Sequence, residues 1–311
     1  QEEAHILNVC SIFGLLPPDQ RLTLARVIEI ADRTAQEAAA TFVDTPPALP
    51  GAGEGRGVKE APSLTIFNSL NWPRTVLLET ASGSKEVTIP SCGYTTLHRM
   101  DAPSNAGRPV MVGERGGPAP FFENEFLRVQ FNPRGEITGL FDKDARREVL
   151  SGPANQFRLY KDVPDMWDAW DLDSMYELQP VATDEPVTLE VLDSGPLVAR
   201  LKLTRRLSQS SITQVISLRR GSRRIEFATT IDWQENHRLL KVAFPVNIHA
   251  NEAIHEIQFG HLRRPNHRSR PYDADRFEVS NHKWTALAEE NRGVAVLNDC
   301  KYGVNVLGNT I

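Results

Sequence analysis

The chain has 311 residues, of which 40% are hydrophobic and 24% are charged, and its net charge is −5. This composition is typical of a globular protein and excludes a disordered chain. It also gives no electrostatic reason to expect nucleic acid or an anionic membrane as a partner, and no apolar run approaches the roughly 20 residues that span a bilayer.

Residues 1–43 are expected to form a helical segment. Apolar residues recur there at spacings of three and four, which places them on one helix face: Leu24, Ile28, Ala31, Ala35, Ala38 and Phe42. Asp19 follows two prolines and is a suitable N-cap. A single amphipathic helix must bury its apolar face, so we interpret this segment as the remnant of a helix bundle.

Short β-strands are expected to follow, separated by two linkers. Residues 44–61 and 101–120 are rich in Pro and Gly and predict linkers. Between them, the apolar runs of 64–68, 75–79 and 86–89 indicate a small β domain over residues 62–100.

The region from 121 to 311 is expected to form a large antiparallel β-sandwich, which makes the chain mainly β. Asn132-Pro133-Arg134-Gly135 predicts a type I turn between strands at 126–131 and 137–141. Over residues 197–204, apolar residues alternate with mostly polar ones, which is typical of an antiparallel strand. Two further strands are expected at 212–218 and 225–231, on either side of a turn at 220–222. Many short strands without alternating helices favour a sandwich over a parallel α/β fold.

The segment Asp162–Asp173 has the most unusual composition, with five acidic residues and two tryptophans in twelve positions. Tryptophan faces and carboxylates are the groups that bind sugars, and paired carboxylates can also act as acid and nucleophile in glycoside hydrolysis. The alternative is a solvated acidic loop that buried tryptophans anchor.

Histidines and cysteines give no clear metal site. His249, His255, His261 and His267 recur every six residues, a separation of about 20 Å in an extended strand, so one ion cannot join them without sharp turns. Cys10, Cys92 and Cys300 lie far apart, which predicts structural thiols in a reducing compartment. No nucleophile elbow, P-loop or dinucleotide fingerprint is present.

Three passages together resemble glycoside hydrolase family 38, the α-mannosidases, especially their cytosolic and vacuolar branch. They are Ile66–Arg74, Asp162–Asp173 with its Trp-Asp-Ala-Trp-Asp core, and the stretch from Phe259 through His282-Lys283-Trp284 to Gly303. The resemblance covers roughly residues 20–311. It implies a small β domain and a large supersandwich similar to galactose mutarotase, and we expect this domain to continue beyond residue 311.

The resemblance also implies zinc-dependent, retaining hydrolysis of terminal α-D-mannosides in mannose and oligosaccharide catabolism, in the cytoplasm. The family's zinc motif and nucleophile belong to an N-terminal barrel with no counterpart here, and Phe13 stands where a later zinc-binding histidine would be. We therefore assign no catalytic residue and no metal ligand to this chain, and expect zinc in the missing catalytic domain. The family's β domain approaches that active site, which makes Trp167, Asp168, Trp170 and Asp171, with His267 and Arg268, the candidate substrate-binding residues.

Two other functions remain open at this point. A stand-alone carbohydrate-binding protein would bind mannose without hydrolysis. An epimerase on a mutarotase-type sandwich would need a converging acid and base, for which His282 and Glu278 are the nearest pair. The expected partners are an α-mannoside or oligosaccharide and the catalytic domain, and self-association into a homo-oligomer is left open.

Overall fold

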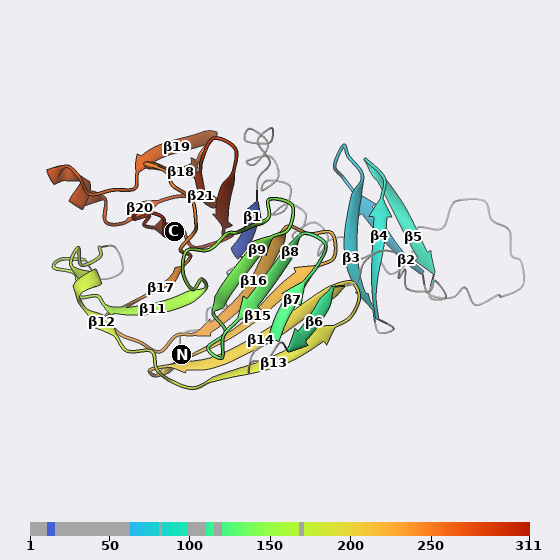
Figure 1. Ribbon diagram of the computed structural model, residues 1–311, viewed down its shortest axis with the longest axis horizontal. Helices are drawn as coiled ribbons and strands as arrows, with labels where there is room; N and C mark the ends of the chain where they lie inside the picture. The colour runs from blue at the N-terminus through green and yellow to red at the C-terminus, as the bar shows by residue number, and fades with distance from the viewer. Residues whose placement is uncertain (1–10, 16–62, 81–82, 99–109, 115–119, 168–170) are drawn as a thin grey trace, which may run out of the picture. The chain divides into compact units, whose positions relative to one another are not determined.

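The computed structural model describes residues 11–15, 63–80, 83–98, 110–114, 120–167 and 171–311. Within these ranges the chain is built almost wholly from antiparallel strands, as the sequence predicts (Figure 1). The described strands fall into two compact units, one holding the strands between 63 and 98 and the other holding β1 and the strands from 111 onward. None of the described helices is long and apolar enough to cross a membrane.

The smaller unit contains two strand pairs. β2 (Ser63–Asn68) pairs with β5 (Gly93–His98), and β3 (Arg74–Thr80) pairs with β4 (Gly83–Ile89). The three strands predicted at 64–68, 75–79 and 86–89 are therefore confirmed. The buried Asn68 amide organises the turn after β2, because it donates to the carbonyls of Trp72 at 2.7 Å and Pro90 at 2.9 Å.

A nine-stranded antiparallel sheet forms one layer of the larger unit, in the order β13-β14-β15-β16-β1-β22-β21-β18-β19. Its strands are β1 (Ser11–Leu15), β13 (Val187–Ser194), β14 (Val198–Leu207), β15 (Ser210–Arg219), β16 (Arg224–Asp232), β18 (Glu252–Ile257), β19 (Gly260–Pro265), β21 (Trp284–Ala288) and β22 (Gly293–Leu297).

Smaller sheets complete this unit. A five-stranded sheet has the order β10-β9-β8-β7-β6, and a three-stranded sheet has the order β12-β11-β17. Their strands are β6 (Met111–Glu114), β7 (Pro120–Glu123), β8 (Leu127–Phe131), β9 (Ile137–Asp142), β10 (Arg147–Glu148), β11 (Gln156–Lys161), β12 (Pro180–Val181) and β17 (Arg238–Ala243). The short strands β20 (Val279–Ser280) and β23 (Gly303–Val304) form a separate pair.

The main core lies between the five-stranded and nine-stranded sheets. Phe122, Val129 and Leu140 come from the five-stranded sheet, and Leu201 and Ile216 come from the nine-stranded sheet, all in one buried cluster. This arrangement confirms the predicted β-sandwich. On β14 the predicted alternation also holds from Ala199 onward, although Val198, expected on the wet face, is buried as well.

Two predicted boundaries are wrong in part. Ser11–Leu15 belongs to a segment predicted to be helical, yet it forms β1, which pairs antiparallel with both β16 and β22. An apolar run of this length does not distinguish strand from helix, so long-range pairing decides its structure. Met111–Glu114 lies in the predicted linker 101–120, yet it forms β6 because Val112 can pair opposite Phe122. The rest of 1–43, the linker 44–61 and residues 101–109 and 115–119 lie outside the described residues.

Candidate substrate-facing surface

The acidic loop leaves β11 and returns through the short 3₁₀ turn η2 (Tyr176–Leu178). Asp162 anchors its start, since its Oδ1 accepts a hydrogen bond from the Asp173 amide at 2.8 Å. Asp173 in turn accepts a hydrogen bond from Gln179 Nε2 at 2.9 Å. The two ends of the loop are therefore tied together by carboxylates.

Trp167 and Asp171 lie in the outward part of this loop. The Trp167 side chain is 63% exposed, so the alternative of a buried tryptophan anchor is wrong at this position. The Asp171 amide donates to the Trp167 carbonyl at 2.9 Å, which brings the two residues together across one turn. Asp168 and Trp170, the other two candidates in the loop, lie outside the described residues.

A buried tyrosine at the end of the loop anchors it to the rest of the larger unit. Tyr176 is 1% exposed, and its hydroxyl donates to Glu278 Oε1 at 2.7 Å while it accepts from Lys241 Nζ at 3.1 Å and Asn305 Nδ2 at 3.2 Å. Burial, and then the nearby Glu278 carboxylate, raise the pKa of the Tyr176 hydroxyl, so it stays a neutral hydrogen-bond donor. Lys241 also forms an ion pair with Glu278.

The next residue joins the loop to a distant part of the chain. Both oxygens of Glu177 bind the Arg268 guanidinium, at 3.0 and 3.1 Å, and Asn305 donates to Glu177 Oε1 at 3.0 Å. This two-point geometry is the one in which an arginine–carboxylate pair is best oriented. We call the Glu177–Arg268 pair the clamp. It joins the residues just after Asp162–Asp173 to the passage that starts at Phe259, and it gives Arg268 a carboxylate partner.

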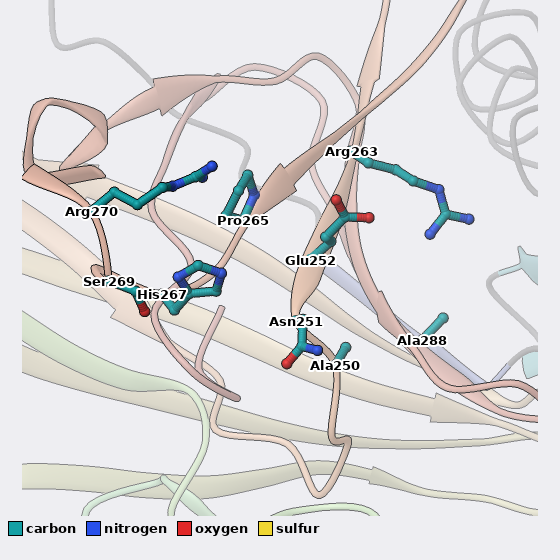
Figure 2. Close-up of a pocket in the computed structure, with 9 residues that line it drawn as sticks. All are labelled: Ala250, Asn251, Glu252, Arg263, Pro265, His267, Ser269, Arg270 and Ala288. Carbon is teal, nitrogen blue, oxygen red and sulfur yellow. The ribbon is translucent and has the colours of Figure 1, made fainter. Parts of the chain in front are cut away.

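His267 faces a different place from its neighbour Arg268. It lines a hollow of about 600 Å³ beside β18 and β19 (Figure 2). The polar side chains around this hollow are Asn251, Glu252, Arg263, His267, Ser269 and Arg270. Behind it, the buried carboxylate of Asp273 lies 3.8 Å from His267 Nδ1 and binds Arg270 at 3.1 Å. Arg270 lowers the pKa of Asp273, so this carboxylate is ionised and fixes that wall of the hollow.

The four evenly spaced histidines do not form one site. His255 is buried and bonds Thr285 at 3.1 Å, His261 lies beside Trp284, and His267 lies near Asp273. Nowhere in the part of the chain that the structure describes do three His, Cys, Asp or Glu side chains gather as a metal ion would require. The donor set of these residues therefore does not fit zinc.

His282 and Glu278, the pair considered for epimerase chemistry, contact different groups of residues. Glu278 binds Tyr176 and Lys241, whereas His282 lies 3.2 Å from Gln258 and stacks near Tyr302. This arrangement gives the epimerase hypothesis no support.

Sequence reasoning missed the residues that hold the surface together. Tyr176, Lys241, Glu278 and Asn305 meet in one hydrogen-bonded group although up to 129 positions separate them in the chain. Each is an ordinary residue in its own segment, and only the fold places them side by side. No local spacing or motif could have identified this group.

Comparison with known proteins covers most of the larger unit. The family model for the glycosyl hydrolases family 38 C-terminal domain matches residues 122–311. Alpha-mannosidase 2C1 of Homo sapiens is 36% identical over 259 residues, which cover 80% of this chain and 25% of that protein. Alpha-mannosidase G of Dictyostelium discoideum is 33% identical over 241 residues, covering 72% of this chain and 22% of that protein.

A solved structure shares the fold. The crystal structure of an alpha-mannosidase from Enterococcus faecalis V583 superposes with a TM-score of 0.58 at 11% sequence identity, covering 99% of this chain and 38% of that one. The chain thus spans about a quarter of the length of these two curated relatives. On the strength of the match over residues 122–311, the chain belongs to glycosyl hydrolase family 38 and carries the C-terminal domain of that family.

Proposed function

We propose that this chain is the C-terminal β part of an α-mannosidase that hydrolyses terminal α-D-mannosides in oligosaccharide catabolism. The family match over residues 122–311 and the relatives named alpha-mannosidases support this assignment. In this proposal the nucleophile and the zinc ion belong to a separate N-terminal catalytic domain, where the metal would orient sugar hydroxyls. The β part described above buttresses that domain and lines part of the active site.

The observation that carries the proposal is a set of exposed apolar side chains along the clamped loop, which we call the exposed strip. Between 163 and 178 the loop exposes Met166 by 72%, Trp167 by 63%, Met175 by 56% and Leu178 by 72%. Several large apolar side chains exposed along one loop are candidates for an interaction surface. A loop that its carboxylates and the clamp hold in place can present such side chains to a neighbouring domain at little entropic cost.

Trp167 and Asp171, together with Asp168 and Trp170, are the residues we propose to approach the substrate. An indole face can pack on the C–H surface of a sugar, and a carboxylate accepts hydrogen bonds from its hydroxyls. Their role is to bind and orient the mannoside, while bond cleavage takes place on the catalytic domain. Of the two candidates at 267 and 268, His267 lines the hollow beside β18 and β19, whereas Arg268 binds Glu177.

We further propose that the protein works in a reducing compartment such as the cytosol. Cys92 is exposed and Cys300 is partly buried, and the two do not form a disulfide with each other. Burial raises the pKa of the Cys300 thiol to about 11, which keeps it protonated and unreactive.

Hydrolysis of a chromogenic α-mannoside tests the proposed function. The full-length polypeptide encoded by the gene should release the chromophore, and its activity should fall when zinc is removed by a chelator and return when zinc is added. Purified 1–311 should show no turnover with or without added zinc. Zinc-dependent turnover by 1–311 alone would overturn the placement of the catalytic groups, and no turnover by either form would overturn the assignment as an α-mannosidase.

A stand-alone carbohydrate-binding protein is the second candidate. It would bind mannose without any hydrolysis by the full-length form, and it would have no need for an exposed apolar strip. The strip therefore favours the first candidate.

A further inference from the structure

The hollow beside β18 and β19 is built on one face of three neighbouring strands. Glu252 pairs with Pro265 of β19, and Ala253 pairs with Leu287 of β21, which sets Glu252 alongside Ala288. Residues two positions apart on a strand share a face. Arg263, opposite Ile254, therefore lies on the same face as Glu252, and both line the hollow in Figure 2.

The charges around the hollow are of both signs and are only partly neutralised. Asp273 holds Arg270 at 3.1 Å, so that guanidinium is paired. Glu252 and Arg263, by contrast, have no ion-pair partner among the residues that the structure describes. Figure 2 shows His267 and Arg270 along one side, Glu252 in the middle and Arg263 on the opposite side. The hollow thus offers an unpaired carboxylate acceptor between two sets of nitrogen donors.

This arrangement discriminates between classes of ligand. A phosphate or sulfate would meet the Glu252 carboxylate, and a metal cation would meet Arg263 and Arg270 with a single carboxylate for a ligand. A neutral polyhydroxylated molecule fits both kinds of group, because a hydroxyl donates to a carboxylate and accepts from a guanidinium, an imidazole or an amide. The remaining walls, Ala250, Pro265 and Ala288, provide apolar contact for C–H groups.

We propose that this hollow is a binding site for a neutral oligosaccharide. Glu252 accepts hydrogen bonds from sugar hydroxyls, and His267, Arg270 and Asn251 donate to sugar oxygens. The size of about 600 Å³ falls within the range of small-molecule sites. The inference that the ligand is a neutral polyhydroxylated molecule comes from the lining of the hollow alone. The choice of a mannose-containing saccharide within that class rests on the proposed function.

The test is a titration of 1–311 with α-1,2-mannobiose, in which calorimetry and saturation-transfer NMR measure binding. Glu252→Ala should weaken binding at least tenfold, and Glu252→Gln, which keeps an amide acceptor, should weaken it less. Glu190→Ala is the matched control, because Glu190 is an exposed carboxylate on the opposite edge strand of the same sheet and should leave binding unchanged. Unchanged thermal unfolding of each variant shows that the fold is intact.

Three outcomes would overturn the proposal: no mannobiose binding by 1–311, binding that Glu252→Ala leaves unchanged, or binding of inorganic phosphate in place of the sugar. The hydrolysis assay separates this proposal from the proposed function. If the full-length form hydrolyses mannosides but 1–311 does not bind mannobiose, the hollow is not a saccharide site and the enzyme assignment stands. If 1–311 binds mannobiose through Glu252 but the full-length form has no activity, the hollow is a saccharide site and the enzyme assignment is wrong.

Discussion

At the scale of single residues, two turn glycines share a backbone conformation but differ in their surroundings. Gly135 has φ of +74° and Gly221 has φ of +71°, a region that costs other L-residues about 1–2 kcal/mol. A Cβ at Gly135 would lie 2.1 Å from a methyl group of the buried Leu203, whereas the nearest atom at Gly221 is 3.7 Å away. The two positions therefore separate backbone strain from crowding.

Gly221→Ala should lower the free energy of unfolding by about 1–2 kcal/mol, the cost of the backbone alone. Gly135→Ala should lower it by a further 1–3 kcal/mol or so, because the new methyl group forces Leu203 out of its packed position. Urea denaturation followed by fluorescence measures both values. Equal losses for the two variants would mean that the core around Leu203 adjusts without cost.

A buried histidine gives the stability a dependence on pH. His255 is 1% exposed, and burial, followed by the nearby Arg264, lowers its pKa to about 4. An unfolded histidine has a pKa of about 6.5, so the unfolded state binds the extra proton between these values. The contribution of the neutral His255 to the free energy of unfolding is therefore fully present above about pH 6.5. It is lost as the pH falls towards 4, which lowers the free energy of unfolding by at most about 3 kcal/mol.

His255→Asn removes this titration and is the variant we would compare with the parent chain. The difference in unfolding free energy between the two should shrink as the pH is lowered from 7 to 4, and denaturant titrations at half-unit steps would measure it. A difference that stays constant over this range would show that His255 does not titrate with a lowered pKa.

At the scale of elements, the clamp determines how firmly the acidic loop is held. Arg268 and Glu177 are 38% and 33% exposed, so the pair contributes little to global stability. Its effect should be local, because it fixes η2 to a segment 91 positions away. Arg268→Ala should speed amide hydrogen exchange of residues 173–179 about two- to fivefold, with a change in unfolding free energy below about 1 kcal/mol.

Lys202→Ala is the control for this experiment, since Lys202 and Glu190 form an exposed ion pair at 3.6 Å between β13 and β14. It should leave exchange in residues 173–179 unchanged. Exchanging the charges, with Glu177→Arg and Arg268→Glu in one chain, should restore part of the protection. Faster exchange spread evenly over the whole unit would contradict a local role for the clamp.

The same elements show what the sequence could and could not predict. Alternation and turn residues act over a few positions, so strands such as β9 and β15 and the turn at Asn132–Gly135 were predictable. Composition also marked the acidic loop. The pairing of Ser11–Leu15 between β16 and β22, and the meeting of Glu177 with Arg268, depend on contacts between distant parts of the chain. No local pattern encodes such contacts.

At the scale of the whole molecule, the exposed strip predicts how 1–311 behaves in isolation. A chain with both Met166→Ser and Trp167→Ser should bind less of a hydrophobic dye and associate less at high concentration. Its unfolding free energy should change by no more than about 0.5 kcal/mol, because both side chains are largely exposed. Under the proposed function, the same changes should lower kcat/KM for the mannoside in the full-length polypeptide.

Val191→Ser with Leu192→Ser is the matched control for the strip, since these residues of β13 are 45% and 46% exposed. They should alter dye binding less and should leave kcat/KM unchanged. Equal effects of the two double variants on both measurements would show that the strip is ordinary surface and not an interface.

The position of β19 at the end of the nine-stranded sheet has a further consequence for self-association. Among the described strands it is an edge, and an edge strand presents unpaired backbone groups to which another chain can add. Arg263 and Arg264 are consecutive on it, so each face of the strand carries a positive charge, and it ends at Pro265, which has no backbone N–H. A second copy arriving antiparallel would bring like charges together and lose a ladder bond at the proline. The strand is therefore protected against open-ended fibre growth, a hazard that every sheet of this size must avoid.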